Sequence, residues 1–352
     1  MTNGASSAIM PELTREVGGG GRFVRQGNRF TTPFGNEPGD LPVEPGRYRL
    51  LWARICPWAH RAVIVRRLLG LEEVISLGTA HPVRTPEGWE FSLDPGGVDP
   101  VLKIRYLTEL YKSTDPGYKG RATVPTVADV RTGTVVNNDY FRLTNDFETA
   151  WRAYHRPGAP DLYPNDLRAE IDALNQILFD EINNGVYKCG FARSQEAYEE
   201  SFDTLFARLD QLDERLSRQR YLFGDRLTDS DVRLYVTLAR FDAAYYGIFR
   251  TNLRRIVDYP GLWAYARDLY QTYGFGDTTD FEAIKRGYSN VLSTGIQPVL
   301  IPRGPDASLW TTAHGRERLG GIPIRSSSVG VIATVGSQVC CFPDSAAVQS
   351  AG

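Results

Sequence analysis

The first regular pattern along the chain is an apolar run, then a helical spacing, then a second apolar run. The run at 47–52 (RYRLLW) has the length and composition of a β-strand, and Cys56 and Pro57 follow it. Proline is best tolerated in the first turn of a helix, so we expect a helix to begin beside Cys56 and to end at Gly70. The run at 74–77 (VISL) predicts another strand. A strand, a helix and a strand in this order predict a parallel crossover.

The following stretch predicts a helix, a hairpin and a further helix. Apolar positions at 101–111 have helical spacing, and two strand-like runs at 123–130 and 132–137 flank a Thr-Gly turn. A short helix is expected at about 140–151. This order of elements is that of a thioredoxin-like domain, which we place at 47–152.

Pro125 interrupts the first strand of this hairpin. A proline cannot donate to a sheet ladder, so it belongs at an edge or in a special turn. A cis peptide bond before Pro125 would present the backbone of Val124 to a ligand.

Between 160 and 300 the pattern changes to long amphipathic helices. Apolar residues recur every three or four positions in two stripes: Leu167, Ile171, Leu174, Leu178 and Ile182, then Tyr198, Phe202, Leu205, Leu209, Leu212 and Leu216. They predict a helical core and carry no evidence of function. Outside these domains we expect an irregular N-terminal extension at 1–46 and a C-terminal tail at 301–352. The predicted fold is an α/β domain followed by an all-α domain.

One helix of the second domain has a distinctive start. Thr228 and Asp231 are spaced as the N-cap and N3 residues of a capping box, and Leu227 and Val232 as the hydrophobic staple. We therefore expect a buried helix to begin at Asp229.

The overall composition narrows the class of protein. The chain has 352 residues, 42% of them hydrophobic and 23% charged, which is typical of a globular protein with two cores. A formal net charge of -2 disfavours nucleic acid as a main partner, so small molecules are the better candidates. The N-terminal residues do not resemble a signal peptide, and no stretch reaches the roughly 18 apolar residues of a membrane span. We therefore expect a cytoplasmic location and no membrane partner.

The cysteines point to one candidate nucleophile. Cys56, Cys189, Cys340 and Cys341 are too few and too irregularly spaced for a disulfide framework, which favours a reducing compartment. At the N-terminus of a helix, unpaired N–H groups and the helix dipole would favour the thiolate of Cys56. The competing interpretation is an inert buried cysteine, the usual fate of a lone one.

The residues around Cys56 limit its chemistry. Ala59 stands where a dithiol oxidoreductase has its second cysteine, so an external thiol must resolve a mixed disulfide on Cys56. Cys189, which we expect in a loop, and the cysteine pair of the tail have no feature that would activate them. His60 could serve as a base, but at this position along the helix it is more often structural. With only four histidines in the chain, no metal site is expected.

Tyrosine is the other unusual feature, with 18 in the chain, among them Tyr187, Tyr245, Tyr246 and Tyr288. Most tyrosines are packing residues. A few phenols that converge over a reactive thiolate could nevertheless bind a phenolic substrate and supply a proton to its ring.

The chain resembles the glutathionyl-hydroquinone reductases, the Xi class of glutathione transferases, from about Arg47 to Pro305. The matching segments, in order along the chain, are CPWAHR (56–61), GW (88–89), GRATVPT (120–126), NNGVYK (183–188), YLFGDRLT (221–228), RFDA (240–243), NLRRI (252–256) and DLYQ (268–271). The resemblance implies a glutathione transferase architecture and a homodimer. It also implies a reaction in which Cys56 attacks the sulfur of a glutathionyl-hydroquinone, releases the hydroquinone, and is regenerated by a second thiol.

The resemblance also implies roles for other residues. Tyr187, Tyr245 and Tyr288 match tyrosines that line the aromatic site of the family. Trp89, and Val124 beside Pro125, match positions that hold glutathione, which would serve as co-substrate.

Two segments depart from the family. Asn138, Asp139 and Tyr140 replace Asn-Glu-Ser, whose Glu and Ser bind the γ-glutamyl end of glutathione at a helix N-terminus. Asp139 is shorter than Glu, and Tyr140 fills the space of a small hydroxyl. The run RGYS at 286–289 replaces His-Tyr-Tyr, so that one aromatic-site tyrosine is missing or displaced.

Two alternatives to the glutathione-dependent reductase therefore stay open. The Asp139-Tyr140 pair, together with basic residues that are mostly arginine, favours the same chemistry with another low-molecular-weight thiol such as mycothiol. The other alternative is a non-catalytic binding module that keeps the fold.

Overall fold

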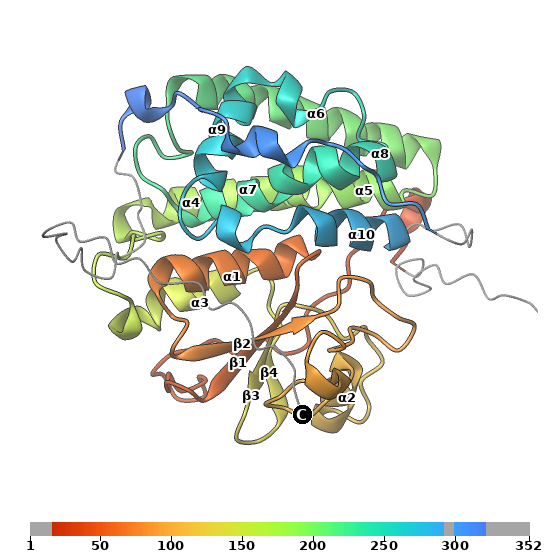
Figure 1. Ribbon diagram of the computed structural model, residues 1–352, viewed down its shortest axis with the longest axis vertical. Helices are drawn as coiled ribbons and strands as arrows, with labels where there is room; N and C mark the ends of the chain where they lie inside the picture. Colours follow the sequence, from red (N-terminus) through yellow and green to blue (C-terminus); the bar gives the residue numbers. More distant parts are fainter. Residues whose placement is uncertain (1–15, 292–298, 322–352) are drawn as a thin grey trace, which may run out of the picture.

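The computed structural model describes residues 16–291 and 299–321 of the chain. A four-stranded sheet forms one end of the molecule and a group of helices forms the other (Figure 1). The predicted combination of an α/β domain and an all-α domain is confirmed. Cys340 and Cys341 lie outside the described residues.

The sheet contains β1 (Tyr48–Ala53), β2 (Ile75–Ala80), β3 (Thr126–Asp129) and β4 (Thr134–Asn137) in the order β2-β1-β3-β4. Strand β1 pairs with β2 in parallel and with β3 antiparallel, and β3 and β4 form an antiparallel hairpin. Both the predicted crossover and the predicted hairpin are therefore present.

The α/β domain has helices α1 (Pro57–Leu69), α2 (Leu107–Thr114) and α3 (Leu143–Thr149). Cys56 is the N-cap of α1, and Gly70 ends it with a left-handed φ of 74° that favours glycine. Figure 1 shows α1 and α3 between the sheet and the second domain, which explains why α1 is almost entirely buried.

Helix α2 begins six residues later than the apolar spacing predicts. Lys103 has a φ of 58°, which a right-handed helix cannot include. The Asp99 carboxylate also accepts hydrogen bonds from the N–H groups of Val101 and Leu102, which holds this segment in a turn.

The regular elements of the second domain are helices, joined by short irregular segments. Its α-helices are α4 (Arg168–Ile177), α5 (Gly185–Phe191), α6 (Gln195–Arg218), α7 (Asp229–Arg240), α8 (Tyr246–Ile248), α9 (Pro260–Tyr270) and α10 (Phe281–Val291). Two π-helical segments, Leu178–Asn183 and Phe241–Tyr245, join α4 to α5 and α7 to α8. The expectation that Cys189 lies in a loop was wrong, because the first π-helical turn leads directly into α5, which contains Cys189.

Short 3-10 segments occur along the described part of the chain. They lie at Gly19–Gly21, Pro95–Gly97, Arg152–Tyr154, Asn165–Leu167, Ile256–Asp258, Gly276–Thr278, Ala307–Thr311 and Glu317–Leu319.

The start of α7 joins the two domains. The predicted capping box is present: the Asp231 carboxylate accepts hydrogen bonds from the Thr228 N–H (2.8 Å) and the Thr228 hydroxyl (3.0 Å), and Leu227 and Val232 are buried. One turn on, Arg233 forms a buried ion pair with Asp229 (2.6 Å). Arg233 also donates to the carbonyl of Phe141, just before α3, at 2.7 Å. The α7 helix therefore makes polar contacts with both domains.

Chain segments outside the two domains also pack on them. The segment 16–46 buries Phe23 and Phe34 and forms a bridge between Thr31 and Asn137 at the end of β4. In the segment 299–321, Trp310 packs against Trp263, and Arg316 donates to three carbonyls at the end of α6. Within the residues that the structure describes, no helix is both long and apolar enough to cross a membrane.

We expect Asp231→Ala to lower the free energy of unfolding by about 3 kcal/mol or more, because buried donors lose their acceptor. Besides Thr228, the carboxylate accepts hydrogen bonds from the Leu222 N–H and the Tyr265 hydroxyl, both at 2.8 Å. Chemical denaturation followed by circular dichroism would measure the loss. Asp225→Ala, an exposed change in the same segment, is the control and should change stability by less than about 0.5 kcal/mol. Equal effects of the two substitutions would contradict the prediction.

Candidate active site

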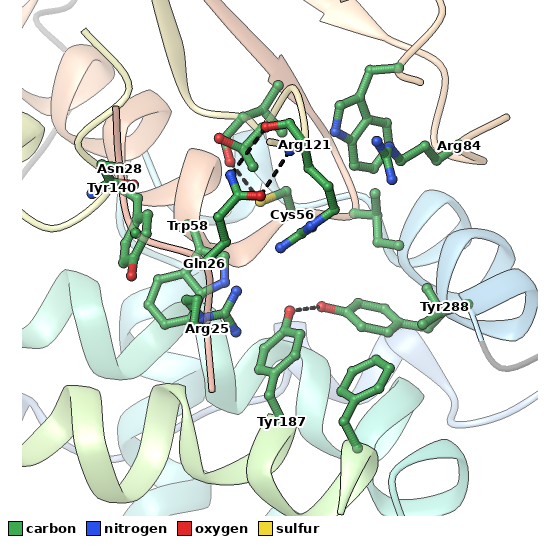
Figure 2. Close-up of a pocket in the computed structure, with 17 residues that line it drawn as sticks. Arg25, Gln26, Asn28, Cys56, Trp58, Arg84, Arg121, Tyr140, Tyr187 and Tyr288 are labelled. Atoms are coloured by element: carbon green, nitrogen blue, oxygen red, sulfur yellow. Dashed lines mark hydrogen bonds between the residues drawn. The ribbon is translucent and has the colours of Figure 1, made fainter. Parts of the chain in front are cut away.

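A cavity lies at the N-terminus of α1. Its empty volume is about 780 Å³, which includes the space at its open mouth. Three parts of the chain line it. They are the N-terminal extension, with Arg25, Gln26, Gly27 and Asn28; the α/β domain, with Ile55, Cys56, Trp58, Arg84, Trp89, Arg121, Thr123, Val124 and Tyr140; and the helical domain, with Tyr187, Phe191, Tyr288 and Val291. Figure 2 shows Cys56 among these side chains. The site therefore requires both domains and the extension.

Cys56 is partly exposed in this cavity, and its Sγ donates a long hydrogen bond to the carbonyl of Val124 at 3.4 Å. Burial raises the pKa of the Cys56 thiol. The backbone N–H groups of Ala59 and Trp58 and the guanidinium groups of Arg240 and Arg25 act in the opposite direction. The lowered pKa expected from the helix N-terminus was wrong, because residues distant in sequence cover the thiol and remove water from it.

Arg240 of α7 holds the turn that precedes Cys56. It donates to the carbonyls of Ile55 (2.8 Å) and Arg54 (3.0 Å) while it is itself fully buried. His60 lies against Arg240 and Thr278, and burial lowers the pKa of its imidazole well below the usual value. These contacts agree with a structural role for His60 rather than the role of a base.

Three tyrosines meet at the helical side of the cavity. The hydroxyl oxygens of Tyr187 and Tyr288 are 2.6 Å apart, and those of Tyr288 and Tyr245 are 3.0 Å apart. Tyr187 and Tyr288 line the cavity, whereas Tyr245 is fully buried behind them. Burial raises the pKa of all three phenols, so they keep their protons and can donate hydrogen bonds at neutral pH.

The residues expected to hold a thiol co-substrate divide into two groups. Trp89, Val124 and Tyr140 line the cavity, and the peptide bond between Val124 and Pro125 is cis. Asp139 is not among the lining residues. Its carboxylate accepts hydrogen bonds from the N–H groups of Phe141 (2.9 Å) and Arg142 (3.2 Å) just before α3.

Tyr140 contributes an aromatic ring to the cavity wall. Its ring packs against Trp58 and Phe179, with centroid separations of 5.1 and 6.1 Å. The backbone donors near α3 are therefore satisfied by Asp139, and the neighbouring space is filled by a ring. The α-carboxylate of a γ-glutamyl group would therefore find these backbone donors occupied and the space next to them filled.

Sequence reasoning missed the contribution of the N-terminal extension. Gln26 exchanges hydrogen bonds with the backbone of Arg121: its amide oxygen accepts from the Arg121 N–H (2.8 Å), and its amide nitrogen donates to the carbonyl (3.3 Å). This fixes the extension over Cys56 and places Arg25 inside the cavity. The extension has no periodicity, so only its isolated phenylalanines, Phe23, Phe30 and Phe34, hinted that it packs. Across the described part of the chain, no three His, Cys, Asp or Glu side chains cluster as metal ligands would.

Comparison with known proteins agrees with this arrangement. Residues 195–268 match the family "Glutathione S-transferase, C-terminal domain". The glutathionyl-hydroquinone reductase YqjG of Escherichia coli, which has also been solved with glutathione bound, is 38% identical over 85% of this chain and 93% of its own. The glutathionyl-hydroquinone reductase PcpF of Sphingobium chlorophenolicum is 41% identical over 80% of this chain and 90% of its own.

Solved structures give the same result. A glutathione transferase from Gordonia bronchialis is 56% identical, with a TM-score of 0.78 over 80% of this chain and 88% of its own. An Xi-class glutathione transferase from Natrialba magadii is 34% identical, with a TM-score of 0.79 over 86% and 96%. The chain belongs to the glutathionyl-hydroquinone reductases, the Xi class of glutathione transferases.

Proposed function

We propose that this protein removes the glutathionyl group from glutathionyl-hydroquinones, or the corresponding thiol-derived group from related aromatic thiol conjugates. The group is transferred through a mixed disulfide on Cys56. The observation that carries the proposal is the placement of a partly exposed cysteine and two tyrosine hydroxyls, those of Tyr187 and Tyr288, on the walls of one cavity. Two relatives, 38% and 41% identical to this chain, are named glutathionyl-hydroquinone reductases.

The proposed reaction begins with the substrate sulfur against Cys56. A tyrosine hydroxyl gives a proton to the ring carbon that carries the sulfur, and a ring hydroxyl gives up its own proton. The Cys56 thiolate then attacks the substrate sulfur. The sulfur–sulfur bond forms as the carbon–sulfur bond breaks, and the electron pair returns to the ring. The hydroquinone therefore leaves as a phenolate, which takes up a proton, and the ring carbon has been reduced.

A second thiol completes the cycle. Ala59 lies one helical turn after Cys56 and offers no second sulfur, so the disulfide cannot be resolved within this turn. We assign this step to glutathione as co-substrate. Its thiolate would attack the mixed disulfide, release Cys56 and leave as the oxidised dimer. The homodimer that the family implies stays a prediction.

Another low-molecular-weight thiol, such as mycothiol, is the second candidate for the co-substrate. The observation that favours it is the pair formed by Asp139 and Tyr140. Asp139 caps the backbone before α3, and the Tyr140 ring lies in the cavity. A thiol without a γ-glutamyl group would not need the donors that Asp139 occupies.

A non-catalytic binding module is the candidate from a different class of function. The raised pKa of the Cys56 thiol favours it, because binding alone requires no thiolate. The placement of Cys56 in the lining of the same cavity as two proton-bearing tyrosines favours the enzyme. Turnover by the purified protein separates the two.

We expect Cys56→Ala to abolish turnover of a glutathionyl-hydroquinone, because no other sulfur lines the cavity among the described residues. Release of hydroquinone, followed by chromatography, is the measurement. Cys189→Ala is the matched control and should keep full activity, since Cys189 is buried within α5 and burial raises its thiol pKa to about 12. Full activity of Cys56→Ala would refute the mechanism.

The pH dependence of the Cys56 thiol is a separate prediction. Because burial raises its pKa, a smaller fraction is thiolate at any given pH than in a free cysteine, and reactivity should rise toward alkaline pH. In the folded variant whose only cysteine is Cys56 (Cys189→Ala, Cys340→Ala and Cys341→Ala), alkylation by iodoacetamide should have its midpoint above about 8.5, the value for free cysteine. A midpoint below that value would show that the N–H groups and arginines outweigh burial.

Restoring the family residues should improve glutathione binding. In the double variant Asp139→Glu with Tyr140→Ser, the ring is removed and a longer carboxylate and a hydroxyl are supplied. We expect the KM for glutathione to fall about tenfold, which corresponds to roughly one net hydrogen bond. A parallel assay with mycothiol should show the opposite change if mycothiol is the natural thiol. An unchanged KM for both thiols would show that this corner does not contact the co-substrate.

A further inference from the structure

Arg25 of the N-terminal extension is a cation inside the Cys56 cavity that the reaction described above does not use. Its guanidinium carbon lies 4.5 Å from the ring centroid of Trp58 and 4.6 Å from that of Tyr187. Its Nε donates to the side-chain oxygen of Asn184 at 2.9 Å. Figure 2 shows Arg25 beside Trp58, on the same side of Cys56 as Tyr187.

One end of this guanidinium has no partner. The Nη2 atom of Arg25 is buried and makes no hydrogen bond to the described residues, and within the same residues no carboxylate forms an ion pair with Arg25. The Arg25 side chain as a whole is only partly buried, but this end of its guanidinium is shielded from water and unpaired, and aromatic faces offset only part of the lost hydration. The site is therefore built for a negative group that enters the cavity.

The surroundings of Arg25 indicate which negative group this is. The guanidinium of Arg25 lies over the rings of Trp58 and Tyr187. The hydroxyl of Tyr187 is in turn hydrogen-bonded to that of Tyr288. Aromatic walls with two phenolic donors suit an aromatic ring that bears oxygen. The α-carboxylate of a γ-glutamyl co-substrate would instead be expected near Asp139 and Tyr140. The guanidinium carbon of Arg25 is 6.0 Å from the ring centroid of Tyr140 and closer to the rings of Trp58 and Tyr187.

We propose that Arg25 binds the phenolate oxygen of the aromatic substrate and stabilises the negative charge that develops as the carbon–sulfur bond breaks. This inference rests on the proposed function. The charge appears when the electron pair of the broken bond returns to the ring, and a guanidinium held by Asn184 and two aromatic rings is well placed to receive it. Arg25 is then a catalytic residue supplied by the extension.

Binding of p-nitrophenol tests the oxyanion site without turnover, because its absorbance reports its ionisation. The protein carries Cys56→Ser, and the pH is about one unit below the pKa of free p-nitrophenol. We expect the bound phenol to ionise when Arg25 is present, to stay protonated with Arg25→Gln, and to ionise in part with Arg25→Lys. Arg29→Gln, an exposed change in the same segment, is the control. Because it leaves Arg25 in place, the bound phenol should ionise as it does without this change. Bound nitrophenol that stays protonated beside Arg25 would overturn the proposal.

Kinetics test the catalytic role. In the protein with Cys56 intact, Arg25→Gln should lower kcat/KM for the conjugate about 100-fold, the usual effect of removing one oxyanion donor. The KM for the thiol co-substrate should not change. A loss confined to thiol binding would assign Arg25 to a co-substrate carboxylate instead. A loss matched by an equal fall in Cys56 alkylation would show that Arg25 acts through the thiolate, because Arg25 also lowers the pKa of Cys56.

The two proposals can fail separately. If the unmodified protein turns over no aromatic conjugate while nitrophenol ionisation still depends on Arg25, the proposed function fails and the oxyanion site stands. If turnover is normal and unaffected by Arg25→Gln, the function stands and the role of Arg25 is refuted.

Discussion

The hydrogen bonds from Arg240 to the carbonyls of Arg54 and Ile55 position the Cys56 sulfur. Those carbonyls belong to the turn between β1 and α1, and Cys56 is the next residue. Arg240 comes from α7 of the other domain, whose first turns are held to the backbone before α3 by Arg233. One helix therefore fixes both the entry to α1 and the approach to α3. Residues of α7 do not line the cavity themselves, so the helix acts on it only through these two points.

The proton-bearing groups of the cavity form a connected wall. Three phenols are joined by hydrogen bonds of 2.6 and 3.0 Å, and burial raises the pKa of each. Arg25 lies over one of these rings as a positive charge without an anion. The cavity thus combines donors that keep their protons with a cation, an arrangement that favours an electron-rich oxygen over a neutral ring. The thiol faces this wall from the α/β domain.

The sequence was most informative where a local rule decides the structure. Pro57 and Gly70 mark the ends of α1, and Thr228 and Asp231 mark the start of α7, because capping depends on neighbours only a few residues away. The start of α2 was predicted too early, since the backbone of Lys103 adopts a positive φ that apolar spacing does not reveal. The π-helical turns beside Tyr187 and Tyr245 were equally invisible to periodicity.

The candidate site was predictable as far as it is local. The Cys-Pro pair at the end of an apolar run pointed to Cys56, and the family motifs added Trp89, Tyr187 and Tyr288. The direction of the thiol pKa could not be predicted, because it depends on how much water the second domain and the extension remove. Arg25 could not be predicted either, since it reaches Cys56 from an irregular segment fastened by Gln26 to the backbone of Arg121.

This fastening makes the segment 16–46 part of both the hydrophobic core and the cavity. Phe34 is buried against Tyr48 and Trp151 of the α/β domain, and Phe23 is buried as well. One wall of the cavity, with its cation, comes from the same segment. Trimming the chain back to β1 would therefore remove core contacts together with the charged wall of the pocket. Selection for stability and selection for activity consequently act on the same residues before the first strand.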